Sequence, residues 1–258
     1  MCLILLAWKA HPKYSLILAS NRDEYHERGS AAAHRWLDSP DIIAGQDLEQ
    51  SGTWMGVTRS GRWAAVTNFR EQLQEAQPKK SRGPFTAGFI MITQSPDSYA
   101  NSVTKELTKD NGFNLIVGDS SSINYITNRP ATAFKPTEPI TQPGIYGLSN
   151  HLLDTPWPKV KNGKMRLQKL INDKEVIQFT DVLELMSDTT KPSDGSLPNS
   201  GVSLDWERTL SSIFITTPEY GTRATSLLLI NNDSSEIQFS EATFDASGTE
   251  LSNQTYIV

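Results

Sequence analysis

The sequence predicts an α+β protein in which antiparallel sheets form the core and helices pack outside them. Short apolar segments bounded by turn residues occur in three groups, at the beginning, in the middle and at the end of the chain. Longer segments with helical periodicity lie between these groups. Strands that follow one another closely favour antiparallel pairing, and separate runs of helices favour helices on the outer faces of the sheets.

Two hairpins are expected in the first 70 residues. The first joins an apolar strand over residues 3–8 to another over residues 15–19, and it ends at the polar tetrapeptide Asn21-Arg22-Asp23-Glu24. The second turns at Ser60-Gly61 and ends at Asn68. Each hairpin therefore ends with polar side chains after an apolar strand.

The rest of the chain alternates between helices and strands without a repeat or a long linker, so we expect one domain over residues 1–258. Proline, asparagine and glycine mark the ends of the expected elements. These are helices over 85–93, 97–108, 157–171 and 176–186, a loop over 190–201, and strands over 113–117, 123–126, 144–149, 212–216, 222–230 and 236–244.

The charge and the apolar segments exclude several classes of protein. The 24 Lys and Arg against 29 Asp and Glu give a net charge of -5 and no basic face, so we expect no nucleic-acid partner. The apolar start lacks a positively charged region and is too short for a signal peptide. No later stretch approaches the roughly 20 apolar residues of a membrane span. We expect a soluble, cytoplasmic protein.

The cysteine and histidine content argues against disulfides and metal sites. Cys2 is the only cysteine, which excludes an internal disulfide and a multi-cysteine zinc site. The four histidines, His11, His26, His34 and His151, show no paired spacing of the metal-ligand kind. We expect neither a metal nor an organic cofactor.

Cys2 is the most informative residue because removal of Met1 would place it at the N-terminus. A free thiol has a pKa of about 8.5 and an α-amine one of about 7.7–8.0. The α-amine can therefore accept the proton of the thiol in its own residue, which supplies both nucleophile and base. The ordinary alternative is a small, buried and inert cysteine at the start of a strand.

Five polar residues complete a candidate site around that thiol. Arg22 favours a thiolate, and the carboxylate of Asp23 can orient the α-amine. The amides of Asn68 and Asn150 can donate to the oxyanion of an acyl-transfer intermediate, although asparagine at a strand end is commonly a turn former. Arg223 precedes an apolar strand, where it is either an edge charge or a further partner of the thiol or of a carboxylate.

These residues, in this order, resemble the NRDE family, named for its tetrapeptide and also called the transport and Golgi organization protein 2 family. The resemblance runs from residue 1 to about residue 230. It is carried by Met1-Cys2, Asn21-Arg22-Asp23-Glu24, Gly52-Thr53-Trp54-Met55-Gly56, Thr67-Asn68-Phe69-Arg70, Ser81-Arg82-Gly83, Gly147-Leu148-Ser149-Asn150 and Gly221-Thr222-Arg223. It implies the N-terminal-nucleophile hydrolase fold, a four-layer αββα sandwich of two antiparallel sheets.

The resemblance also implies roles for the candidate residues, by analogy with bile-salt hydrolases and penicillin V acylases. Those enzymes use an N-terminal Cys, an Arg, an Asp, two Asn and a second Arg. By position, these resemble Cys2, Arg22, Asp23, Asn68, Asn150 and Arg223. Arg22 and Asp23 are adjacent here, whereas the acylases separate theirs. Because adjacent strand residues point to opposite faces, Arg22 is the better candidate.

Three functions are consistent with these residues. The first is an amidohydrolase that cleaves a non-peptide C–N bond of a small-molecule amide through an acyl-Cys2 intermediate. The second is a carrier of a small hydrophobic ligand, since the resemblance also links the family to haem and lipid trafficking. The third is an adaptor in which Cys2 is only modified. Homo-oligomer formation is left open.

Overall fold

Two antiparallel sheets form the core of the protein. The computed structural model describes residues 3–71, 81–106, 111–131 and 135–258. In these ranges, the first sheet contains, in spatial order, β10 (Gly144–Leu148), β1 (Leu3–Trp8), β2 (Tyr14–Tyr25), β11 (Tyr220–Asn231), β12 (Ile237–Phe244) and β13 (Glu250–Ile257). The second contains β3 (Ser30–Trp36), β4 (Ser39–Asp47), β5 (Met55–Thr58), β6 (Trp63–Asn68), β7 (Phe113–Gly118), β8 (Ile123–Thr127) and β9 (Thr137–Pro139).

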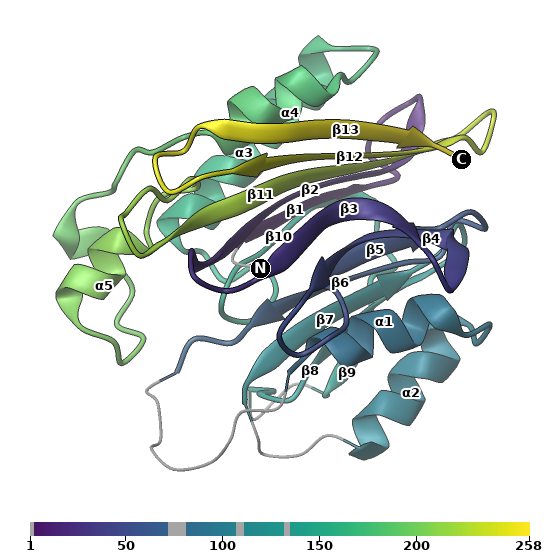
Figure 1. Ribbon diagram of the computed structural model, residues 1–258, viewed down its shortest axis with the longest axis horizontal. Coiled ribbons are helices and arrows are strands. Elements are labelled where there is room, and N and C mark those ends of the chain that lie inside the picture. The colour runs from purple at the N-terminus through teal and green to yellow at the C-terminus, as the bar shows by residue number, and fades with distance from the viewer. Residues whose placement is uncertain (1–2, 72–80, 107–110, 132–134) are drawn as a thin grey trace.

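The sheets face each other and carry helices on their outer faces (Figure 1). Helices α3 (Pro158–Asp173) and α4 (Phe179–Met186) cover the first sheet, and α1 (Gly83–Met91) and α2 (Pro96–Glu106) cover the second. A short 3-10 helix, η1 (Asp194–Ser196), and α5 (Leu204–Thr209) lie between α4 and β11. This is the expected four-layer αββα sandwich, and the prediction of fold class is confirmed.

Strand β1 is a continuous apolar run because both of its faces are buried. Leu3 and Leu5 pack in the outer core beneath α3 and α4, whereas Ile4, Leu6 and Trp8 pack in the core between the sheets. Successive residues of a strand point to opposite faces, so a strand in the middle of a sandwich must be apolar at both parities. The first sheet therefore has β1 and β2 near its centre.

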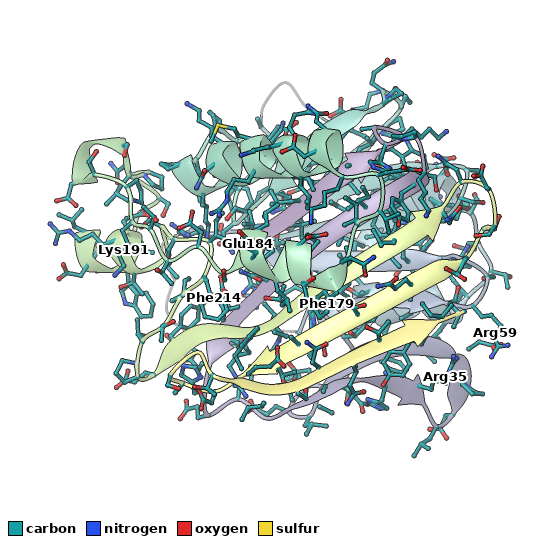
Figure 2. The ribbon with its side chains drawn as sticks, turned by 90° about the horizontal axis from the view of Figure 1, so that it is seen from above. Arg35, Arg59, Phe179, Glu184, Lys191 and Phe214 are labelled. Atoms are coloured by element: carbon teal, nitrogen blue, oxygen red, sulfur yellow. The ribbon has the colours of Figure 1, made fainter. Side chains whose placement is uncertain are left out.

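The outer core of the first sheet is built from one face of each covering helix. Phe179 and Val182 of α4 are buried together with Phe214, which lies in the segment between α5 and β11. Figure 2 shows α4, with Phe179 and Glu184, lying over the strands of this sheet. Gly163 of α3 is also needed, because a Cβ there would come within 2.9 Å of the Leu5 side chain. These contacts hold α3 and α4 against β1 and β2.

Most of the expected elements are present, but several boundaries differ. Both early hairpins form, and the helices and strands expected between residues 85 and 186 are found, with α4 starting at Phe179 rather than at residue 176. The prediction of a strand over 212–216 is wrong, since that segment makes only a single bridge, Thr216 to Gly221. Strands β3, β4, β9 and β13 and helix α5 were not expected. No helix in the described segments is long and apolar enough to span a bilayer.

Candidate active site

Strand β2 carries the polar tetrapeptide through the middle of the first sheet. The strand continues to Tyr25, so Asn21, Arg22 and Asp23 are strand residues rather than part of a turn. All three are almost completely buried, with exposed fractions of 0%, 4% and 2%. Because neighbouring strand residues point to opposite faces, Arg22 lies on one side of the sheet, and Asn21 and Asp23 lie on the other.

Arg22 points into the space between the two sheets. Its guanidinium stacks on the ring of Trp54 at 4.4 Å, and its Nη1 is 3.5 Å from the hydroxyl of Ser30. Gly45 makes room for this indole, since a Cβ there would lie 2.2 Å from the Trp54 ring. Burial lowers the pKa of Arg22, and the nearby carboxylate of Glu24 opposes this shift. The second sheet thus provides the surface on which the Arg22 cation rests.

Glu241 of β12 is a buried acid on the same inner face, and it was not among the expected site residues. It is 1% exposed. Its Oε1 accepts a 2.6 Å hydrogen bond from the backbone N–H of Ala33, and its Oε2 accepts one of 3.0 Å from the Ser226 hydroxyl. Burial raises the pKa of Glu241, and the hydrogen bonds and the Arg22 cation oppose this effect.

The sequence contains a signal that identifies Glu241. Ile237 and Phe239 alternate along β12 and pack in the core between the sheets. Glu241 is the next residue in this inward series, so an acid occupies a position where the pattern calls for an apolar side chain. A buried acid in such a pattern marks a functional site or an ion pair.

Asn21 and Asp23 face the helix-covered side. Asn21 donates through Nδ2 to the carbonyl oxygens of Met186 and Ile213, each at 2.9 Å, and accepts at 2.7 Å from Thr225 Oγ1. These bonds fasten the end of α4 and the segment before β11 to the sheet. The Oδ1 of Asp23 accepts a 2.7 Å hydrogen bond from the Thr222 hydroxyl. Asp23 and Arg22 are therefore on opposite faces of the strand.

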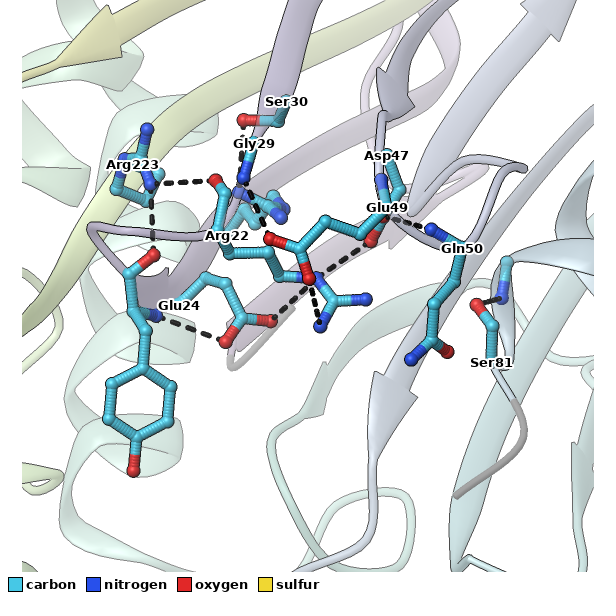
Figure 3. A network of polar contacts seen from close by, with 12 residues as sticks. Arg22, Glu24, Gly29, Ser30, Asp47, Glu49, Gln50, Ser81 and Arg223 are labelled. Atoms are coloured by element: carbon cyan, nitrogen blue, oxygen red, sulfur yellow. Dashed lines mark hydrogen bonds and ion pairs between the residues drawn. The ribbon is translucent and has the colours of Figure 1, made fainter. Parts of the chain in front are cut away.

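Arg223 lies at an irregularity of β11. The pairing with β2 shifts between Thr222 and Ala224, which leaves Arg223 as an extra residue. Its Nη1 donates to backbone carbonyls of the turn between β2 and β3, at 2.9 Å to Tyr25 and 3.0 Å to His26. Figure 3 shows Arg223 close to Arg22 and Glu24. Arg223 secures this turn, and its charge contributes to lowering the pKa of Arg22.

The two candidate asparagines are in direct contact. The side-chain Nδ2 of Asn150 donates to the backbone carbonyl oxygen of Asn68 at 3.1 Å. Asn68 ends β6 in the second sheet, whereas Asn150 follows β10 in the first. The backbone carbonyl of Asn150 also accepts from the N–H of Arg70 at 2.6 Å. These contacts join the two sheets at one end of the sandwich.

A buried polar chain holds the residues on either side of Asn150. Thr67 Oγ1 donates to the carbonyl of Ser149 at 3.1 Å, and Asn114 Nδ2 donates to the carbonyl of His151 at 3.0 Å. The hydroxyl of Tyr125 donates in turn to Asn114 Oδ1 at 2.7 Å. Burial raises the pKa of Tyr125 to about 12, so this donor stays protonated at neutral pH. The backbone of residues 149–151 is thereby fixed by the second sheet.

A pocket of about 470 Å³ lies next to this seam, which is the set of contacts around residues 149–151 that joins the two sheets. Arg70 and His151 line it, together with Trp157 and the segment 196–200. Arg70 stacks on Trp157 at 4.6 Å and forms a buried 2.7 Å ion pair with Glu207. Burial and the Arg70 cation lower the pKa of His151, which keeps its imidazole neutral at neutral pH. Neither the pocket nor Glu207 was expected from the sequence.

The strand register relates these groups to the start of β1. Leu3 pairs with Asn21 of β2, and Ile4 pairs with Leu148 of β10. The start of β1 therefore lies between the segment that leads into Asn150 and the strand that carries Arg22. Cys2 precedes Leu3 and is outside the described residues. In the described ranges, no three His, Asp, Glu or Cys side chains gather as a metal site.

The arrangement of the sheets and helices defines the class of protein as one with the N-terminal-nucleophile hydrolase fold. The penicillin V acylase of Agrobacterium tumefaciens superposes with a TM-score of 0.50 at 10% identity, over 100% of this chain and 86% of that one. An N-acylethanolamine-hydrolyzing acid amidase ortholog of Caenorhabditis elegans also gives 0.50 at 10% identity, over 91% and 95%. At this level of identity, the likeness shows the fold alone.

The sequence comparisons then identify the family. Residues 1–246 match the family Transport and Golgi organisation 2, and the chain belongs to it. Similar relatives include the Transport and Golgi organization protein 2 homologs of Bos taurus, 32% identical over 254 residues, and Homo sapiens, 30% identical over 252. Each of these alignments covers 90% of this chain and 90% of the relative. The family resemblance expected from the motifs is confirmed.

Proposed function

We propose that this protein is a cysteine amidohydrolase, which cleaves a non-peptide amide bond of a small molecule through an acyl-Cys2 intermediate after Met1 is removed. The main support is the position of the start of β1 between the Asn150 segment and Arg22. One neighbour in structure is, by its name, an ortholog of an N-acylethanolamine-hydrolyzing acid amidase, which supports the choice of an amide bond. We also infer that residues 1–258 form one domain, because both sheets contribute to the site.

The ladders of β1 supply the reason for choosing Arg22 and Asn150. Leu3 pairs with Asn21, so one further step along the β1–β2 ladder, to the position before Leu3, reaches Arg22. Ile4 pairs with Leu148, so two further steps along the β1–β10 ladder, to the same position, reach Asn150. Our proposal gives Cys2 this next position. Ile4 packs between the sheets, and the residue two positions earlier in a strand shares its face. A thiol on that face would share it with the Arg22 cation.

The proposed reaction uses the two ionisable groups of an N-terminal cysteine. The α-amine accepts the thiol proton, and the thiolate attacks the carbonyl carbon of the amide. The carbonyl electron pair moves to oxygen, where the amide of Asn150 or Asn68 donates a hydrogen bond to the oxyanion. Collapse breaks the C–N bond, and the ammonium returns the proton to the departing amine. Water then hydrolyses the thioester and regenerates Cys2.

In this proposal, the other charged candidates take no part in bond making. Arg22 stabilises the thiolate by its charge. Asp23 faces away from Arg22 and contacts Thr222 beside the β11 irregularity, so we assign it a positioning role. Arg223 holds the turn after β2 and contributes to the field at Arg22, which makes it a second positioning residue.

The first experiment is the intact mass of the untagged protein, followed by a hydrolysis screen. Loss of Met1 is expected, as is release of amine from at least one member of a panel of N-acyl amides. Cys2→Ala should abolish that release. A form with an uncleaved N-terminal extension is the matched control, because it keeps the thiol but has no free α-amine at Cys2. Retention of Met1, or full turnover by Cys2→Ala, would refute the proposal.

A further inference from the structure

We propose that Glu241 is the buried counter-charge of Arg22, and that it offsets the positive potential which Arg22 exerts on the reacting thiolate. This inference rests on the proposed function. Glu241 acts as a positioning residue, because it sets the field around the nucleophile without taking part in bond making. It also explains why an acid occupies the inner face of β12.

Burial of both groups means that each charge needs compensation from its surroundings. Glu241 is 1% exposed and Arg22 is 4% exposed, and a buried charge is stable only when it is paired or fully hydrogen-bonded. Arg22 is the cation whose field acts on the Glu241 carboxylate. Within the described part of the chain, no ion pair closer than 4.0 Å is found for either residue. Their attraction therefore acts through space, in a setting with little solvent.

The strand register puts the two residues on the same face of the first sheet, two strands apart. Ser226 of β11 pairs with Glu241 on one side and with Ser20 on the other. Ser20 faces the second sheet, because its hydroxyl contacts the sulfur of Met55 at 3.3 Å. Arg22 is two residues further along β2 and shares that face. Glu241 is thus reached from Arg22 by a short diagonal across β11.

The carboxylate of Glu241 is held in place independently of Arg22. Ala33 belongs to the second sheet and donates to Oε1, whereas Ser226 belongs to the first and donates to Oε2. Donors aimed at both oxygens favour the ionised form. A glutamine has the same shape and can accept from Ala33 and pair with the Ser226 hydroxyl. Glu241→Gln therefore removes the charge with little reason for movement.

The two acids that act favourably on Arg22, Glu24 and Asp47, also have a second cation beside them. Glu24 and Asp47 act favourably on Arg22, and Arg28 and Arg223 act unfavourably. Arg28 itself binds Asp47 at 2.8 Å and lies 3.8 Å from Glu24 and 3.7 Å from Glu49, so these acids are already engaged.

On the side of β13, Tyr256 also feels the Glu241 charge, which contributes to raising the pKa of this phenol. The Tyr256 hydroxyl donates to the carbonyl of Ala33 at 2.9 Å. In this inference, loss of the Glu241 charge increases the net positive potential around Arg22.

The alkylation of Cys2 by iodoacetamide tests this inference without a substrate. Cys2 is the only cysteine, so intact mass gives the rate at one site as a function of pH. Glu241→Gln should lower the midpoint of the rate profile by about one pH unit, because an anion near the thiolate is lost. Arg22→Gln should raise it. Glu250→Gln is the matched control, since Glu250 is exposed on β13.

A midpoint in Glu241→Gln that equals the Glu250→Gln value, or that rises, overturns the inference. If Glu241→Gln does not fold, ¹³C NMR titration of the Glu241 carboxyl in the wild type and in Arg22→Gln replaces it. Removal of Arg22 should then raise the Glu241 midpoint by about one pH unit or more, and an unchanged midpoint overturns the inference.

The two proposals fail in different ways. Turnover that survives in Cys2→Ala refutes the amidohydrolase, whatever the alkylation profiles show. If turnover depends on Cys2 and Glu241→Gln leaves the midpoint of the alkylation profile unchanged, only the role of Glu241 is refuted.

Discussion

Arg70 contacts Asn150 twice, through its backbone N–H to the Asn150 carbonyl at 2.6 Å and through Nη2, which is 3.5 Å from Oδ1. The same guanidinium reaches Glu207, whose other oxygen accepts from the backbone N–H of Ser200 at 2.9 Å. One buried ion pair therefore links the seam between the sheets to the segment that lines the neighbouring pocket.

Replacement of Glu207 by alanine should strongly destabilise the fold. The side chains of Arg70 and Glu207 are 6% and 4% exposed, so the variant leaves an uncompensated buried cation. The expected loss of unfolding free energy is about 3–5 kcal/mol, measured by urea denaturation. Arg59→Ala breaks an ion pair with Asp41 that is 64% and 73% exposed, and it serves as the control. Equal losses in the two variants would contradict this reading of the pair.

Tyr125→Phe should lower stability because it removes the donor to Asn114. The Oδ1 of Asn114 is buried and would lose the 2.7 Å hydrogen bond. We expect a loss of about 1–3 kcal/mol, with Tyr25→Phe at an exposed position as the control. A thermal midpoint of Tyr125→Phe equal to that of Tyr25→Phe would show that this hydrogen bond contributes nothing.

The raised pKa of Tyr125 also predicts a loss of stability in alkali. The folded pKa is about 12 and the ordinary value is 10.0, so between these values the unfolded chain releases the phenol proton and the folded chain keeps it. Stability from this group is complete below about pH 10, and it falls by about 1.4 kcal/mol per pH unit up to about pH 12. Urea denaturation at several pH values should show a smaller slope for Tyr125→Phe than for the wild type.

Asn21→Ala should impair stability while leaving the charges at Arg22 in place. The change removes two donors to the carbonyls of Met186 and Ile213 and the acceptor of the Thr225 hydroxyl. A loss of at least about 2 kcal/mol is expected, because buried polar groups lose their partners. The iodoacetamide profile of the folded protein should keep the wild-type midpoint. A shifted midpoint without a loss of stability would contradict the structural role of Asn21.

Gly45→Ala should disturb the surface on which Arg22 rests. The new Cβ would meet the Trp54 ring at 2.2 Å, so the indole must move. Overpacking of this kind costs about 1–3 kcal/mol, and displacement of Trp54 should also change the alkylation profile of Cys2. Gly195→Ala is the control, because nothing lies within 4 Å of its added Cβ. Identical behaviour of the two variants would show that Trp54 does not hold Arg22.

The fold could be predicted where burial leaves a clear pattern in the sequence. Strand β1 is apolar at every position because it is buried on both faces, and the turn at Ser60-Gly61 marks the second hairpin. Strand β13 was missed because most of its residues are polar and exposed at the sheet edge. The segment 212–216 was wrongly predicted as a strand, since Ile213, Phe214 and Ile215 are apolar and buried but do not pair as a strand.

The candidate site could be predicted only in part. Asn68 ends β6 and Asn150 follows β10. These strands end at the same end of the sandwich, and there the two residues are in contact. Sequence spacing left the faces of Arg22 and Asp23 unresolved until β2 was seen to continue to Tyr25. Glu241 is distant in sequence, and its relation to Arg22 depends on the packing of three strands.

Three hydrogen bonds to the backbone carbonyls of residues 149–151 hold the two sheets together along one edge of the sandwich. Thr67, Arg70 and Asn114 donate them from the second sheet. The halves of the molecule cannot part at this edge without breaking all three, whereas β13 at the other side is largely exposed. We expect separation to start near β13 and to reach the candidate site last, so that amide hydrogens beside Asn150 exchange only with global unfolding.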